Sequence, residues 1–412
     1  MKTKPPTLAS HVINAVLKHV RTNKDSLIAT PCPATENPFA EISDEEAEGA
    51  AESLLKSAHI SENSRRSPAN NIETSLLIVG IDWGAMKTAI KAAYAGSDEL
   101  LIDETIPTVL GYPKDGLVAT ALPENATSFF GREALTHRRH LQLTHPTLSS
   151  TAAADFARHL RARVQIHPDT EIRAVIAVPP TFDGVLRENL RQILGEHFQS
   201  VILLPSPYLA ALGHNSSNAK PSHDNLILID LGATAITASL VQGYYPAPEE
   251  QVSVDFGASD LDQLLRNAIL EKYPDAEISP ITVRLLKEKH SCVGYPEKPI
   301  HVDIILSGQP KTVDLTDEIT TACNELLYRT AESIKTLLID NALESESVVP
   351  IVLTGGANRI KNFAHELETI LLAEGYKNAR VTIAPSTSSL VALGALRAGR
   401  QARERHWQQV SR

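Results

Sequence analysis

The chain reads Ile78-Val-Gly-Ile-Asp82-Trp-Gly84-Ala-Met-Lys-Thr-Ala-Ile-Lys near the start of its β-rich part. An apolar run leads into Asp-x-Gly, a turn of small residues follows, and the chain returns in a second strand-like run. The same order recurs in Leu226-Ile-Leu-Ile-Asp230-Leu-Gly232-Ala-Thr-Ala-Ile-Thr-Ala-Ser. The two aspartates lie 148 positions apart (230 minus 82), which leaves room for one domain between them. A repeat on this scale predicts two similar lobes, although two unrelated hairpins remain an alternative.

Both hairpins have the chemistry of a phosphate site. Glycine allows the backbone to approach a bulky anion, and successive N–H groups in a tight turn form an anion-binding nest. An aspartate at the end of a strand can hold Mg²⁺ through water, because Mg²⁺ keeps several of its waters. Two such hairpins facing each other would hold a triphosphate from both sides. The predicted phosphate and magnesium residues are Asp82, Gly84, Ala85, Lys87, Asp230, Gly232, Ala233 and Thr234, with Asp82 and Asp230 as the magnesium carboxylates.

A third glycine turn lies in Ile351-Val-Leu-Thr-Gly-Gly-Ala-Asn-Arg-Ile-Lys. An apolar strand opens here into Gly355 and Gly356 and then into a helix. Such a turn lets the backbone approach a flat base or a sugar closely, although a plain strand-to-helix turn is the alternative. The order Asp-x-Gly, Asp-x-Gly, Gly-Gly favours one nucleotide site built from all three turns.

From Leu76 onward, strand patterns alternate with amphipathic helix patterns, which predicts mixed α/β sheets covered by helices. We predict a first lobe over 76–207 with a small insert at about 97–150, and a second lobe over 208–384. A C-terminal helix over 385–412 is expected to return to the first lobe.

Residues 1–75 differ from the rest because they are rich in Pro, Ser, Asn and Glu, and Phe39 is their only aromatic residue. This composition predicts a disordered extension. Apolar periodicity over 8–20 and a capping-box pattern at Ser43 also predict two short helices within it. These helices could be transient, or could dock onto a partner or onto the protein's own body.

Composition limits the classes of function. The formal net charge of −10 argues against a general nucleic-acid binder, because such proteins neutralise phosphates with Lys and Arg. No apolar run approaches the roughly eighteen residues of a membrane span, so we expect none. The cysteines Cys32, Cys292 and Cys323 lack metal-ligand spacing, and their small number favours a reducing, cytoplasmic location.

The three glycine motifs, together with Val178-Pro-Pro-Thr-Phe-Asp, resemble the actin-like ATPases, which have a duplicated, ribonuclease H-like fold of two lobes. The resemblance covers roughly Leu76 to Arg400. Within this superfamily the chain is most similar to the MamK family of bacterial actins, which organises magnetosome chains. The segments that carry this similarity include Gly111-Tyr-Pro-Lys-Asp, Glu250-Gln-Val-Ser-Val and Val283-Arg-Leu-Leu-Lys-Glu-Lys-His-Ser-Cys-Val-Gly.

The resemblance implies a cytoplasmic filament whose assembly depends on ATP and Mg²⁺. The implied partners are further copies of the chain added head to tail, another actin-like protein and magnetosome-associated proteins, with no nucleic acid. It also implies that Gly355, Gly356 and Ala357 lie at the adenosine, with Lys287 and Lys289 nearby and Asp262 near the ribose.

The chain departs from bacterial actins at residues that serve hydrolysis. Ser206, in Leu203-Leu-Pro-Ser-Pro-Tyr, stands where the family has the glutamate that positions the attacking water. Serine is not a base near neutral pH, and losing a positioned general base typically costs roughly 10²–10⁴ in rate. Thr237 stands where a second carboxylate is usual. We therefore predict nucleotide binding with weakened hydrolysis, although the nearby acids Asp183 and Glu188 could compensate.

Two points stay open on the sequence alone. Lys87 could donate to a phosphate, as lysines do in other phosphate loops, or could be a solvated strand residue. The protein could form filaments itself, or could be a nucleotide-binding pseudoenzyme that co-assembles with or regulates another actin-like filament. The family resemblance favours the first function, and Ser206 with the unusual extension favours the second.

Overall fold

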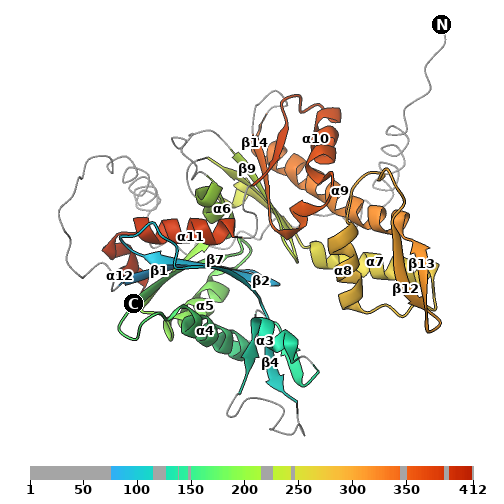
Figure 1. The fold of residues 1–412 in the computed structure, drawn as a ribbon. Helices are drawn as coiled ribbons and strands as arrows, with labels where there is room; N and C mark the ends of the chain where they lie inside the picture. The colour runs from blue at the N-terminus through green and yellow to red at the C-terminus, as the bar shows by residue number, and fades with distance from the viewer. Residues whose placement is uncertain are drawn as a thin grey trace. The chain divides into compact units, whose positions relative to one another are not determined.

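A computed structural model describes residues 76–114, 127–137, 139–146, 150–214, 226–242, 246–343, 350–384 and 389–410 (Figure 1). The described residues belong to one compact unit of the chain. The predicted extension over 1–75 and its two short helices lie outside the described residues.

The described chain contains two five-stranded sheets with the same strand order. The first has the order β3-β2-β1-β7-β8 and the second β11-β10-β9-β14-β15. In each sheet three antiparallel strands are followed by two parallel ones. The strands of the first sheet are β1 (Leu76–Trp83), β2 (Lys87–Tyr94), β3 (Ile102–Pro107), β7 (Glu171–Val178) and β8 (Ser200–Pro205). Those of the second are β9 (Leu226–Leu231), β10 (Ile236–Val241), β11 (Gln251–Val254), β14 (Pro350–Thr354) and β15 (Arg380–Ile383). This duplication confirms the two similar lobes that the repeat predicts.

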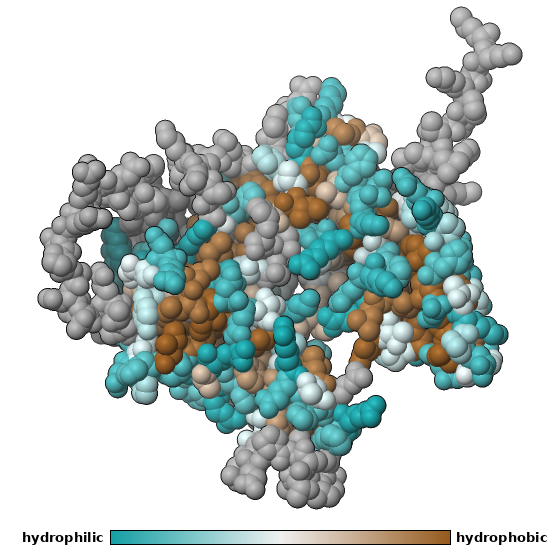
Figure 2. Space-filling model, viewed as in Figure 1, coloured by the Kyte–Doolittle hydropathy of each residue, from teal (hydrophilic) through white to brown (hydrophobic). Residues whose placement is uncertain are grey.

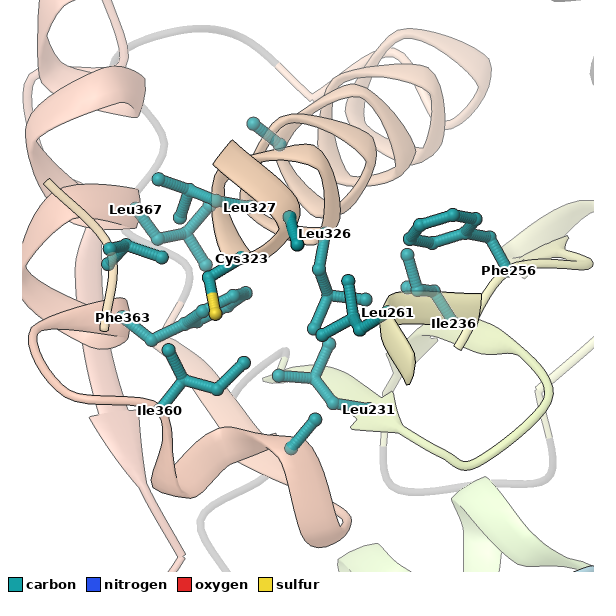
Figure 3. Close-up of a cluster of buried hydrophobic side chains, with 14 of the residues drawn as sticks. Leu231, Ile236, Phe256, Leu261, Cys323, Leu326, Leu327, Ile360, Phe363 and Leu367 are labelled. Carbon is teal, nitrogen blue, oxygen red and sulfur yellow. The ribbon is translucent and has the colours of Figure 1, made fainter. Parts of the chain in front are cut away.

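Helices cover the outer face of each sheet. On the first sheet, α4 (Ser150–Val164) and α5 (Gly184–Gly195) lie on the same face (Figure 1). Their buried side chains pack against alternate side chains of β1. On the second sheet, the helices α7 (Ala258–Lys272), α9 (Thr316–Asp340) and α10 (Phe363–Ala373) pack against alternate side chains of β9. Figure 3 shows this second core, in which α9 packs among residues of β9, β10, α7 and α10; the labelled residues are Leu231, Ile236, Phe256, Leu261, Cys323, Leu326, Leu327, Ile360, Phe363 and Leu367.

The inner faces of both sheets share a third cluster with α6 (Ser206–His214) and α11 (Leu390–Gln401). The two helices cross in direct backbone contact, because a Cβ atom on Gly394 would lie 1.7 Å from the carbonyl oxygen of Leu209. Arg397 of α11 then donates to the carbonyl oxygens of Leu212 and Gly213 at the end of α6, at 2.9 and 3.1 Å. These contacts join α11 to α6.

Smaller elements extend from each sheet. A three-stranded sheet of β4 (Leu110–Pro113), β5 (Phe129–Phe130) and β6 (Leu141–Thr144) carries α3 (Gly131–Thr136). Beyond the second sheet lie α8 (Pro280–His290) and the hairpin of β12 (His301–Leu306) and β13 (Gln309–Asp314), and α12 (Glu404–Val410) packs beside β8. The predicted domain boundaries themselves stay a prediction.

The surface in the view of Figure 2 is a mixture of hydrophilic and apolar side chains, with the apolar surface divided into several separate areas. In the described part of the chain, each helix is too short or too polar to cross a bilayer.

Candidate nucleotide-binding site

The turns of the two repeated hairpins have the same geometry. In the first, Trp83 pairs with Thr88 across a four-residue turn, and in the second Leu231 pairs with Ile236 in the same way. A Cβ atom on Gly84 would lie 2.8 Å from the carbonyl oxygen of Lys87, three residues later. A Cβ atom on Gly232 would lie 2.9 Å from the carbonyl oxygen of Ala235, again three residues later. Each Asp-x-Gly glycine therefore closes a turn that a side chain would force open.

The carboxyl groups of Asp82 and Asp230 lie close enough to influence each other. Burial and, to a smaller extent, the negative charge of Asp230 together raise the pKa of Asp82 from 3.8 to about 7. Burial likewise raises the pKa of Asp230 to about 6. Both residues nevertheless retain some solvent exposure. The structure thus brings the two predicted magnesium carboxylates together.

These two carboxylates fit a divalent cation. Among the described residues, neither has an ion-pair partner that would offset its charge. A cation between them would relieve both the desolvation and the mutual repulsion that raise their pKa values. The described residues contain no cluster of three or more His, Cys, Asp or Glu side chains suited to a metal. A site with few protein carboxylates suits Mg²⁺, which keeps several waters, better than a cation that needs a full protein cage.

The second turn is supported by the start of α7. The backbone N–H of Ala258 donates to the carbonyl of Gly232 at 3.0 Å, and that of Ser259 to the carbonyl of Ala233 at 2.8 Å. Gly257 makes this approach possible, because a Cβ there would lie 2.6 Å from the Ala233 carbonyl group. The sequence reading missed Gly257, and its only sequence signal is a glycine immediately before a helix.

The third glycine motif lies against the second hairpin. Strand β14 pairs in parallel with β9, and Gly355 follows it with a φ of 86°. Gly356 and Ala357 begin the short helix η4 (Gly356–Arg359); Gly356 is exposed and Ala357 is buried. The second and third motifs are therefore neighbours, as one shared site requires.

Lys287 and Asp262 form an ion pair with 2.7 Å between Nζ and Oδ1. The same ammonium group donates to the carbonyl of Ala258, the first residue of α7. Lys287 thus ties α8 to the helix that supports the second turn. The contacts of Lys287, Asp262, Gly356 and Ala357 with adenosine stay predictions.

The remaining predicted phosphate residues lie on the turns themselves. Ala85 and Ala233 are partly exposed, and Lys87 and Thr234 are exposed. The exposure of Lys87, at the first position of β2, is compatible with both of its predicted roles.

The residues considered for hydrolysis are held in structural contacts. Ser206 Oγ donates to the carbonyl oxygen of Val178 at 3.2 Å, which joins the start of α6 to β7. Asp183 caps α5 by accepting from the N–H of Leu186 at 2.8 Å. Glu188 accepts from Nε of Arg191 at 2.9 Å. Both acids that could replace the family glutamate therefore already accept hydrogen bonds from residues of α5.

Comparison with known proteins agrees with this architecture. The family model described as MreB/Mbl protein matches residues 77–406. A MamK-like protein of Paramagnetospirillum magneticum (strain ATCC 700264 / AMB-1) is 29% identical over 354 residues, covering 82% of this chain and 99% of that protein. Actin-like protein MamK of the same strain is 30% identical over 348 residues, covering 81% of this chain and 95% of that protein.

Solved structures point the same way. The chain of a MamK double helical filament has a TM-score of 0.71 at 26% identity, over 80% of this chain and 100% of that one. A non-polymerising MamK mutant bound to AMPPNP has a TM-score of 0.59 at 26% identity, over 79% of this chain and 99% of that one. MreB5 of Spiroplasma citri bound to ADP shares the fold, with a TM-score of 0.63 at 17% identity, over 78% of this chain and 95% of that one. The chain therefore belongs to the MreB/Mbl family of actin-like proteins, and its relatives within that family include MamK.

Proposed function

We propose that the protein binds ATP with Mg²⁺ and forms cytoplasmic filaments of the MamK type that organise or position magnetosomes. The observation that carries the binding proposal is the pair of equivalent glycine turns, each of which follows a strand with a partly buried aspartate near its end, Asp82 or Asp230. The filament proposal is supported by the similarity to the chain of a MamK double helical filament.

In this proposal the two turns hold the phosphates through backbone N–H groups, and Asp82 and Asp230 hold Mg²⁺ through water. When bound, Mg²⁺ supplies positive charge that offsets the phosphates and both carboxylates. Gly355, Gly356 and Ala357 lie at the adenosine, and Lys287 and Asp262 fix the neighbouring start of α7. Because residues of both sheets take part, nucleotide binding would favour one arrangement of the lobes over others.

We also propose that hydrolysis is weakened. Ser206 lacks a basic group, and its hydroxyl already donates to Val178. Without a positioned base, turnover would fall by roughly 10²–10⁴ relative to an intact active site. Slow turnover would keep the nucleotide in its triphosphate form for longer.

The second candidate function is a nucleotide-bound pseudoenzyme that co-assembles with or regulates another actin-like filament. The engagement of Ser206, Asp183 and Glu188 in structural contacts favours it, because loss of turnover costs such a protein little.

One experiment separates the two. Purified protein is sedimented and imaged by electron microscopy with ATP and Mg²⁺, with ADP and with EDTA, alone and with a MamK filament protein. Head-to-tail contacts that do not close give filaments of unlimited length, so filaments from the purified protein alone support the first function. Pelleting only with the second protein supports the pseudoenzyme. Absence of nucleotide binding in a parallel titration would refute both.

A further inference from the structure

Strand pairing places a row of three side chains at the end of each sheet. In the second sheet, Asp230 of β9 is paired with Thr237 of β10 on one side and with Thr354 of β14 on the other. Directly paired residues of neighbouring strands project from the same face of a sheet. The Asp230 carboxylate therefore lies between two threonine side chains, on the inner face that carries Leu228 and Val352.

The first sheet has the same row without hydroxyl groups. Asp82 of β1 is paired there with Ala89 of β2 and Ala177 of β7. Since the two sheets have the same strand order, the change from alanine to threonine marks one chemical difference between the two rows, the presence of hydroxyl groups. The carboxylate of the second hairpin has hydroxyl groups beside it, and that of the first has only methyl groups.

Both threonines are buried, with exposures of 8% for Thr237 and 1% for Thr354. The Oγ1 atom of Thr354 has no hydrogen-bond partner. Leaving a buried hydroxyl without a hydrogen bond is unfavourable, so a threonine is a poor choice here on packing grounds, and a valine would fill the same space. A hydroxyl can donate to a carboxylate and accept from a water at the same time.

We infer that Thr237 and Thr354 are positioning residues for Asp230, and that they make the second hairpin the more ordered side of the site for the hydrated Mg²⁺ of a bound nucleotide. With Mg²⁺ bound, their hydroxyls would orient the carboxylate and accept hydrogen bonds from the water shell of the cation. Asp82, between two alanines, would hold the same cation through water without a neighbouring hydroxyl to orient its carboxylate. The inference rests on the proposed nucleotide site and assigns unequal roles to its two aspartates.

The test uses the substitutions Thr237→Val and Thr354→Val, which keep the side-chain shape and the β-branch, and Thr237→Ser and Thr354→Ser, which keep the hydroxyl. Affinity for a non-hydrolysable ATP analogue is measured on the full chain with Mg²⁺ and with EDTA. Removing one hydroxyl should weaken binding with Mg²⁺ by roughly 5–20-fold. With EDTA the change should stay within about 2-fold, and the serine variants should retain most of the wild-type affinity.

Ser239→Ala is the matched control. This hydroxyl is also fully buried and without a partner on β10, but its strand partner on β9 is Leu228, not Asp230. We expect no change in the Mg²⁺ dependence. A further arm places each valine in an Asp230→Asn background, where the hydroxyl should have nothing left to position and the valine should cost no more.

Equal losses with and without Mg²⁺, wild-type affinity in both valine variants, or a valine effect that persists beside Asp230→Asn would each overturn the inference. If one valine variant does not fold, as judged by thermal unfolding, the other and its serine counterpart decide the question. Failure of the wild-type chain to bind the analogue would refute the proposed function itself, and the two failures are thereby distinguishable.

Discussion

Gly355 lies directly against the carboxylate of Asp230: a Cβ atom at position 355 would fall 2.5 Å from Asp230 Oδ1 and 2.4 Å from the carbonyl oxygen of Leu231. The backbone at Gly355 also has a φ of 86°, which side chains of L-residues rarely tolerate. The third motif and the second hairpin can therefore meet only through a glycine.

We predict that Gly355→Ala weakens nucleotide binding and destabilises the fold. The added methyl group would push the Asp230 carboxylate aside and strain the backbone, with an expected loss of about 1–3 kcal/mol in stability. Nucleotide titration and urea unfolding measure the two effects. Gly195→Ala, at the end of α5 and outside the site, is the control, because a Cβ there meets no atom within 4 Å. If both variants behaved alike, the close contact with Asp230 would not be the reason for Gly355.

Some of this site can be predicted from the sequence because its signals are local. Each Asp-x-Gly turn follows its own apolar strand, and the recurrence of the pattern is visible without any knowledge of the fold. The relation between Thr354 and Asp230 is different, since it exists only because β14 pairs with β9 in one register. Nothing near either residue encodes that register, so sequence reasoning passed over Thr354.

The partnership of Lys287 with Asp262 was also beyond local reasoning. The family resemblance associated both residues with the adenosine side of the site, but not with each other. Their ion pair depends on α8 packing against α7, and its second contact, with the Ala258 carbonyl, depends on where α7 begins. Gly257 likewise acquires a role only once α7 is placed on the second turn.

A prediction about Lys287 follows from these contacts. Lys287→Met should weaken binding of the Mg²⁺–ATP analogue by roughly 10-fold, because a half-buried Asp262 would lose its partner and the start of α7 would be released. Lys298→Met, an exposed change in the loop after the same helix, should alter affinity by less than about 3-fold. Titration calorimetry of both variants checks this. Equal losses would mean that total positive charge matters, not the contact with α7.

The raised pKa values of Asp82 and Asp230 predict how the nucleotide-free protein responds to pH. Both carboxyl groups have folded-state pKa values above the ordinary 3.8. Their contribution to stability is therefore complete below pH 3.8, and is lost as the pH rises through about 6 and about 7. In EDTA, we expect these two groups to lower the free energy of unfolding as the pH rises from 5 to 8. Bound Mg²⁺ with nucleotide should reduce this loss of stability.

Asp82→Asn tests the source of this loss of stability. The variant should lose less stability than the wild type between pH 5 and pH 8, by about 1–2 kcal/mol after allowance for partial exposure, while binding Mg²⁺–nucleotide poorly. Urea unfolding at the two pH values measures the difference. Asp169→Asn, which changes a side chain that is 93% exposed, is the control and should follow the wild type. A wild-type pH dependence in Asp82→Asn would show that the aspartate pair is not its source.

The assignment of weakened hydrolysis to Ser206 can be tested by restoring the missing group. Ser206→Glu should raise the rate of phosphate release, by up to roughly 10²-fold if the carboxylate reaches the attacking water. It should also remove the hydrogen bond to the Val178 carbonyl, at a cost of about 1 kcal/mol in stability. Ser206→Ala is the matched control, since it loses the same hydrogen bond without gaining a base and should leave turnover unchanged. Phosphate release and thermal unfolding are measured for all three proteins. A wild-type rate as fast as that of an intact bacterial actin would show that another group already positions the water, and a fall in rate in Ser206→Ala would give the serine hydroxyl a direct part in turnover.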